Sequence, residues 1–123
     1  MAQFNRVVPV LKVRDLQETI EFYNRQLGFE LCWRAPNDGG GDNCMVKRDG
    51  ISILFSTGSH LGDKPQFSGT LYIDMIGVDA FYAKVKDAVP LVWPLEVMNY
   101  GSKEFGVRDP NGYVIAFSEA VTQ

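Results

Sequence analysis

Histidine is the scarcest chemically versatile residue in this sequence, since His60 is the only one among 123 residues. Zinc centres and Ser-His or Cys-His nucleophile pairs rely on imidazole groups. His60 lies in a polar connector rich in Gly, Ser and Pro, so we expect a solvated surface residue there. This scarcity disfavours both metal-dependent and nucleophilic catalysis.

Cysteine, basic residues and long apolar runs are also scarce. Cys32 and Cys44 are too few for a disulfide framework, and Cys32 has no histidine near it in sequence. The formal net charge of -3 leaves no basic stripe for a nucleic acid. No apolar run is long enough for a signal peptide or a membrane span. We therefore expect a cytoplasmic protein with reduced thiols and with neither a nucleic-acid nor a membrane partner.

What the sequence does contain is a pattern of α and β segments typical of one globular domain over residues 1–123. The first half predicts strands at 7–13, 29–34, 44–47 and 51–56, with a helix from Asp15 to Gly28. The second half predicts strands at 70–76, 95–98, 104–107 and 113–118, with a helix opening at Val78. The connector covers about 58–68.

The two halves repeat each other. Phe22-Tyr23 on the first predicted helix matches Phe81-Tyr82 on the second, and ISILFS after Gly50 matches YVIAFS after Gly112. This repetition predicts an α+β fold of paired βαβββ modules, at about 5–57 and 69–120. Chance similarity of two α+β segments is the alternative.

Alternation along the predicted strands gives each one an apolar face and a mixed face. The apolar faces, expected to pack on the helices, carry Val7, Pro9, Leu11 and Val13; Ile51, Ile53 and Phe55; Leu71, Ile73 and Met75; and Tyr113, Ile115 and Phe117. The mixed faces include Ser52, Ser56, Tyr72 and Asp74. Such faces suit the lining of a ligand cleft, although a plain solvated face is the alternative.

Several motifs together resemble the vicinal-oxygen-chelate (glyoxalase-like) superfamily, and within it the bleomycin-resistance group. They are PVL, RD, FY and LGFE in the opening VPVLKVRDLQETIEFYNRQLGFE, and EFGVRDPNG near the end. The resemblance covers Val7 to Glu119. It implies a curled mixed sheet with helices outside, and a homodimer that often exchanges its N-terminal strand and forms clefts between subunits.

The same resemblance assigns the family's four metal-ligand positions to Val8, Leu54, Thr70 and Ala116. Three of these side chains have no donor atom, and threonine is a poor ligand for a transition metal. We therefore expect neither a metal nor another cofactor, and no catalytic residue that depends on one.

Aromatic residues are the remaining candidates for a ligand site. The predicted ligand-binding set combines strand faces with family position: Trp33, Ser52, Ser56, Tyr72, Asp74 and Tyr100. Flat rings can stack on a heteroaromatic ligand or hold a cation. Packing or interface roles for Trp33 and Tyr100 are the alternative.

These observations predict a metal-free protein that binds a small molecule and sequesters an antibiotic of the bleomycin (glycopeptide) type. The acidic run typical of the resistance group after the second strand is missing, so a cationic drug would meet Arg34 there. One alternative is an enzyme without a metal, with Asp74, Glu104 or Tyr72 as acid or base. A partner-binding domain with an empty cleft is the other.

Overall fold

The computed structural model describes residues 2–66 and 68–121, in which the order βαβββ occurs twice. The first module contains β1 (Val10–Lys12), α1 (Leu16–Arg25), β2 (Glu30–Pro36), β3 (Asp42–Arg48) and β4 (Ile51–Ser56). A short 3-10 helix, Ser59–Leu61, follows it. The second module contains β5 (Thr70–Asp74), α2 (Val78–Val85), β6 (Leu91–Val97), β7 (Ser102–Arg108) and β8 (Val114–Ala120). The predicted α+β fold of paired modules is confirmed.

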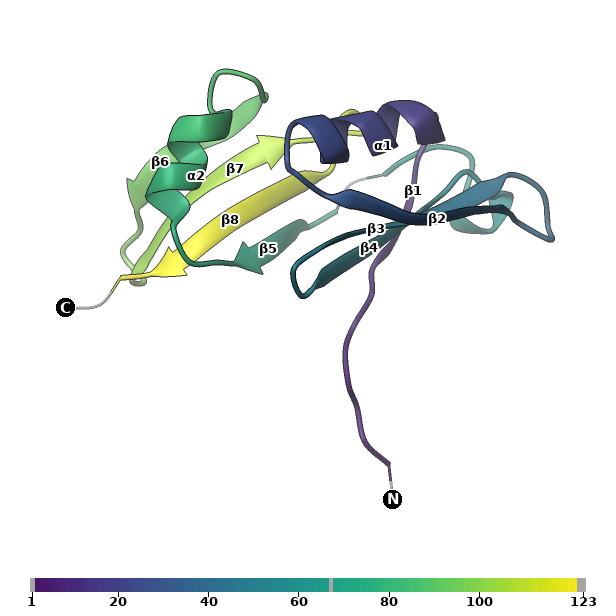
Figure 1. Ribbon diagram of the computed structural model, residues 1–123, viewed down its shortest axis with the longest axis horizontal. Helices are drawn as coiled ribbons and strands as arrows, with labels where there is room; N and C mark the ends of the chain where they lie inside the picture. Colours follow the sequence, from purple (N-terminus) through teal and green to yellow (C-terminus); the bar gives the residue numbers. More distant parts are fainter. Residues whose placement is uncertain (1, 67, 122–123) are drawn as a thin grey trace.

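Each module forms its own four-stranded mixed sheet. Sheet A has the order β1-β4-β3-β2 and sheet B has the matching order β5-β8-β7-β6. In each sheet the first strand runs parallel to the last strand of its module, and the other pairs are antiparallel. Both helices lie on the same side of the two sheets (Figure 1). We call the opposite side of each sheet its helix-free face.

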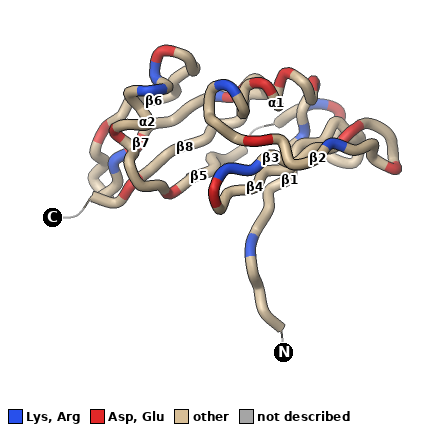
Figure 2. Tube along the Cα trace, in the orientation of Figure 1, with Lys and Arg blue, Asp and Glu red and all other residues tan. Residues whose placement is uncertain are grey.

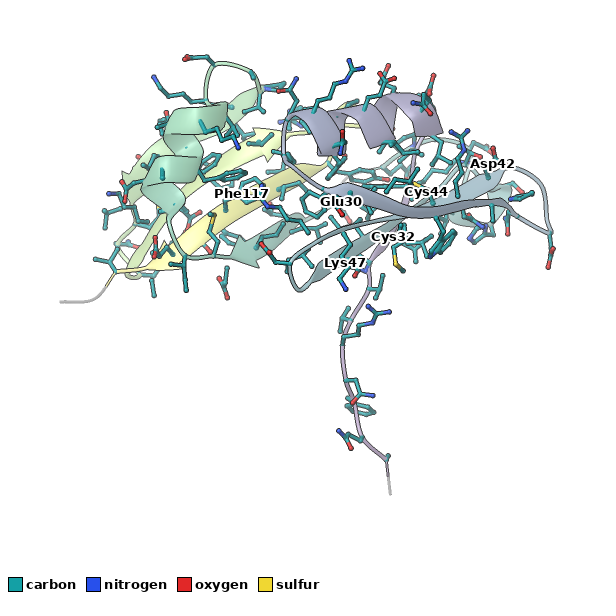
Figure 3. All side chains as sticks on the ribbon, in the orientation of Figure 1. Glu30, Cys32, Asp42, Cys44, Lys47 and Phe117 are labelled. Carbon is teal, nitrogen blue, oxygen red and sulfur yellow. The ribbon has the colours of Figure 1, made fainter. Side chains whose placement is uncertain are left out.

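The core lies between the helices and the sheets and joins both modules in one apolar cluster. Tyr23 of α1 is fully buried against the rings of Phe29 and Phe55. In the second module the ring of Phe81 contacts that of Phe117, which Figure 3 labels between α2 and β8. One member of each repeated Phe-Tyr pair, Tyr23 or Phe81, thus packs the helix of its module on the sheet.

Each module also contacts the helix of the other through a turn. The Tyr23 hydroxyl donates to the Asp109 carboxylate at 2.7 Å, in the turn between β7 and β8. In the reverse direction, the guanidinium of Arg48 lies over the Phe81 ring, 5.2 Å from its centroid, and donates to the Leu27 carbonyl at 2.6 Å. These two contacts join the modules and fix the orientation of the two sheets relative to each other.

The predicted first strand is longer than the observed one. Val10–Lys12 pairs with β4, and the Pro9 carbonyl also accepts a hydrogen bond from the Leu54 amide at 3.0 Å. Most of residues 2–9, called here the N-terminal arm, extends away from the body (Figure 1). Val7 is 91% exposed and Phe4 99% exposed, so the predicted inward position of Val7 is wrong. Val7 alternates with its neighbours as predicted, but it lies in the arm, beyond the part of the strand that sheet A pairs and covers.

The strand predicted at 95–98 is also corrected, because β6 begins at Leu91. The segment between Pro90 and Pro94 precedes the predicted strand, and proline is disfavoured in the interior of a sheet. Since β6 is the edge strand of sheet B, Pro94 can lie within it without leaving a ladder hydrogen bond unmade. No helix in the described part of the chain is long and apolar enough to cross a membrane.

Candidate functional site

The helix-free face of sheet B carries a row of aromatic and small residues. Cross-strand register aligns Tyr72 with Ala116, Ala116 with Gly106, and Gly106 with Trp93. Trp93 lies directly on Gly106, since a Cβ at that glycine would come within 2.6 Å of the indole ring. The two large rings therefore stand at the two ends of a row whose middle residues, Gly106 and Ala116, are small and buried.

The next row of the same face is polar. It aligns Asp74 with Ser118 and Ser118 with Glu104, and Glu96 is the partner of Glu104 on β6. Glu104 is fully buried. The Ser118 hydroxyl donates to the Asp74 carboxylate at 2.9 Å. Three carboxylates thus stand in one line across sheet B.

Two tyrosine hydroxyls converge on Glu104. Tyr72 donates to Oε2 at 3.0 Å, and Tyr100, from the turn between β6 and β7, donates to Oε1 at 2.6 Å. The hydrogen bond to Glu104, and then the one to Tyr72, raises the pKa of Tyr100 well above its ordinary value. Their rings stay open to solvent, with 52% of Tyr72 and 63% of Tyr100 exposed.

Sheet A carries an equivalent row, in which Val10, Leu54, Met45 and Trp33 are aligned. Trp33 pairs with Met45 just after a register shift, as Trp93 pairs with Gly106. The two tryptophans therefore occupy the same place in the two modules. Trp33 is 41% exposed and does not belong to the buried core.

The predicted serines have local partners on sheet A. Ser52 accepts a hydrogen bond from the Arg6 guanidinium at 3.4 Å, and Ser56 accepts one from the Gly58 amide at 3.0 Å. Both serines are buried. Ser56 therefore keeps its O–H donor and one acceptor lone pair for a further contact.

The six predicted ligand residues are divided between the sheets. Trp33, Ser52 and Ser56 lie on sheet A, and Tyr72, Asp74 and Tyr100 lie on sheet B or beside it. Glu104 brings Tyr72 and Tyr100 together, and a hollow of about 190 Å³ between β4 and β5 is lined by both Ser52 and Tyr72. Within the described residues, no hydrogen bond joins Trp33 to the sheet B set.

A second hollow, of about 510 Å³, lies where the two modules meet. Its lining includes Phe29, Phe81 and Phe117 of the core cluster, so it opens toward the helix layer. Asp74 is the only predicted ligand residue on its wall. Apart from Asp74, the site residues described above are therefore not on the wall of this hollow.

Metal coordination does not fit the residues at the four family positions. Val8, Leu54 and Ala116 offer no donor atom, and no group of three or more His, Cys, Asp or Glu side chains that could hold a metal ion occurs in the described part of the chain. Burial raises the pKa of the Cys44 thiol to about 11, which makes it a poor nucleophile.

Arg34 does not occupy the position expected from the sequence. It pairs in register with buried Cys44, on the helix side of sheet A, and donates to Gln17 of α1 at 3.1 Å. Its guanidinium also lies 3.5 Å from the Asp42 carboxylate. A ligand on the helix-free face therefore does not meet Arg34.

Sequence reasoning missed Trp93 and the bonding role of Glu104. The repeated triplets Leu31-Cys-Trp33 and Leu91-Val-Trp93 could have revealed the first. Glu104 was considered only as an acid or base, because its tyrosine partners come from separate segments whose register is not visible in the sequence.

A family model described as "Glyoxalase superfamily protein" matches residues 1–123. No curated protein sequence matches the chain. The fold is similar to a bleomycin-binding protein from Streptomyces verticillus complexed with copper(II)-bleomycin, with 24% identity, 100% of both chains covered and a TM-score of 0.70. It is also similar to TnmS3, an antibiotic binding protein from Streptomyces sp. CB03234, with 20% identity, 98% of both chains covered and a TM-score of 0.78.

Proposed function

The chain belongs to the glyoxalase superfamily, and from that premise we propose that it is a metal-free small-molecule-binding protein that sequesters a bleomycin-type antibiotic or a related drug. The observation that carries the proposal is the set of exposed rings on the helix-free faces, Trp33, Tyr72 and Tyr100. Exposed aromatic rings beside polar groups suit the stacking of a flat ligand. Two proteins of similar fold are described as bleomycin-binding and antibiotic-binding, which supports this choice.

The proposed site is shared by two copies of the chain. In one chain the predicted ligand residues are split between two sheets, and the hollow of about 190 Å³ that reaches both is smaller than ordinary drug-sized pockets of roughly 300–1,000 Å³. A homodimer that places sheet A of one copy over sheet B of the other would complete a cleft. The exposed arm, with Phe4 and Val7, is suited to exchange between the copies.

Binding is favoured over acid–base catalysis because both oxygens of Glu104 already accept hydrogen bonds from tyrosine hydroxyls. A metal-free enzyme that uses Asp74 or Tyr72 is the second candidate. The free thiols of Cys32 and Cys44 support the cytoplasm as the expected compartment. We also propose that residues 1–123 act as one domain, because a single apolar cluster joins modules 5–57 and 69–120.

A thermal-shift screen tests the proposal, since a ligand that binds only the folded state raises the melting temperature. Bleomycin-type, heteroaromatic and cationic compounds form the panel. Trp33→Ala and Tyr100→Ala should each weaken binding of a hit by about 1 kcal/mol or more, with little change in the denaturation midpoint.

A structural role for these rings predicts the reverse, with roughly 3–5 kcal/mol of folding stability lost for a buried aromatic. A falling midpoint with unchanged affinity per folded molecule would remove both residues from the site. The absence of any stabilising compound in the panel would remove the sequestration role itself.

A further inference from the structure

Three carboxylates on the helix-free face of sheet B lack a cation. Among the described residues, none of Asp74, Glu96 and Glu104 forms an ion pair with a lysine or arginine. Glu96 and Glu104 are direct cross-strand partners, and like charges in that arrangement destabilise a sheet. The helix-free face of sheet B therefore holds a line of carboxylates that no lysine or arginine of the described residues pairs with.

The carboxylate at the centre of this line is built into an aromatic site. Fully buried Glu104 holds one tyrosine hydroxyl on each oxygen, at 3.0 Å and 2.6 Å, and both rings are more than half exposed. A hydroxyl that donates to a carboxylate becomes a better acceptor for a second donor, because hydrogen bonds in a chain polarise one another. The hydroxyl oxygens of Tyr72 and Tyr100 are thus better hydrogen-bond acceptors for a cationic donor than those of free tyrosines.

We propose that Glu104 is a positioning residue that holds Tyr72 and Tyr100 as a subsite for the cationic group of a flat ligand. This inference rests on the proposed binding function and adds the charge class of the ligand. A protonated amine or ring nitrogen would donate to the tyrosine oxygens and lie against the ring faces. The acidic run missing after β2 thus has a substitute on β5, β6 and β7.

The Trp93 ring supplies a flat neighbour for this subsite. It lies over Gly106, one row away from Glu104 on the same face. Its indole Nε1 is buried and has no hydrogen-bond partner among the described residues. A flat ligand would lie against the Trp93 and Tyr72 rings at the two ends of this row, with its charged edge toward the next row, which holds Glu104.

Two acridines of nearly the same shape test the proposal. At pH 7.5, 9-aminoacridine is a cation and acridine is neutral, and the affinity of each for the full-length protein follows from fluorescence titration. We expect the wild type to bind the cation about tenfold more tightly than the neutral dye. Glu104→Gln keeps the size of the side chain and removes its charge, so it should bring this ratio close to one and change acridine binding little.

Two further variants isolate the effect. Tyr100→Phe keeps an exposed ring but loses the hydroxyl bonded to Glu104, so it should lower the ratio even if Glu104→Gln folds poorly. Glu21→Gln removes an exposed carboxylate of α1, far from sheet B's helix-free face, and should leave the ratio unchanged.

Each outcome has a defined meaning. Equal affinity of the wild type for the two dyes overturns the cation subsite and leaves small-molecule binding standing. An equal fall in the ratio for Glu21→Gln and Glu104→Gln assigns the preference to net charge and also overturns the subsite. Binding of neither dye overturns it as well, while the antibiotic panel separately decides the proposed function.

Discussion

Removal of the Tyr23 hydroxyl should loosen the junction between the modules. In Tyr23→Phe the ring stays packed against Phe29 and Phe55, but buried Asp109 loses the donor to its Oδ2 at 2.7 Å and keeps the two backbone amides on Oδ1. A hydrogen bond to a charged group contributes about 1.5–3 kcal/mol, so we expect a loss of that size in the free energy of unfolding at pH 7.5. For a domain of this length, each kcal/mol lowers the melting temperature by roughly 3–6 °C.

The pH dependence of this loss follows from Asp109. Burial raises the pKa of its carboxyl in the folded state, and the hydrogen bond from Tyr23 lowers that pKa. The folded state therefore binds the proton more tightly than the unfolded state, whose pKa is about 3.9, and stability falls as pH rises through this window. Without the hydroxyl the pKa rises further, so the cost of the substitution should shrink between pH 7.5 and pH 4.5.

Urea denaturation of both proteins at the two pH values measures this difference. Tyr82→Phe is the control, because Tyr82 on α2 also packs against a core ring, that of Phe105, and its hydroxyl has no hydrogen-bond partner in the described residues. It should cost much less. A cost for Tyr23→Phe that is the same at pH 7.5 and pH 4.5, or no larger than that of Tyr82→Phe, would refute the assigned bond.

Three other expectations concern the free faces and the arm. Gly106→Ala would displace the Trp93 ring, at a cost of roughly 1–3 kcal/mol in the free energy of unfolding. In a Trp33→Phe background it should change the fluorescence emission of Trp93. Gly39→Ala, in open space, should not change it. Sedimentation at micromolar concentration should give a homodimer, and deletion of residues 2–8 should weaken it; a wild-type monomer of 13.8 kDa would contradict the shared cleft. Elemental analysis of untagged protein should find no stoichiometric transition metal, and about one Zn, Ni, Mn or Fe per chain would contradict the donor-set argument.

The fold could be predicted from the sequence because the internal repeat reveals the same order of strands and helix in both modules. The strand predicted at 51–56 is the observed β4, and one ring of each Phe-Tyr pair, Tyr23 or Phe81, packs its helix on the sheet. Predictions from local sequence patterns were wrong where the position of a strand in the sheet determines the structure. Pro94 is tolerated only because β6 is an edge strand, and Val7 alternates correctly but lies beyond the sheet.

The site was less accessible to sequence reasoning than the fold. Tyr72, Tyr100 and Glu104 come from β5, a turn and β7, and only the cross-strand register shows that they meet. Arg34 illustrates the same limit, because the register shift between Leu31 and Trp33 turns its side chain toward α1.

The N-terminal arm carries a single charged side chain, that of Arg6. Arg6 is visible as the one blue section of the arm in Figure 2. Its guanidinium already reaches Ser52 at 3.4 Å. Arm exchange in the proposed dimer would therefore depend mainly on apolar contacts, and its strength should respond weakly to salt.

The alignment of the two modules has a consequence for how new specificity can arise. Two helix-facing positions are the same in both copies of the repeat, with Ile53 matching Ile115 and Phe55 matching Phe117, whereas the free-face pair Leu54 and Ala116 differs. The two modules thus share these core residues but differ at the middle of the helix-free face. Engineers could randomise the outer surface of one sheet at a time, and effects from well-separated positions should add.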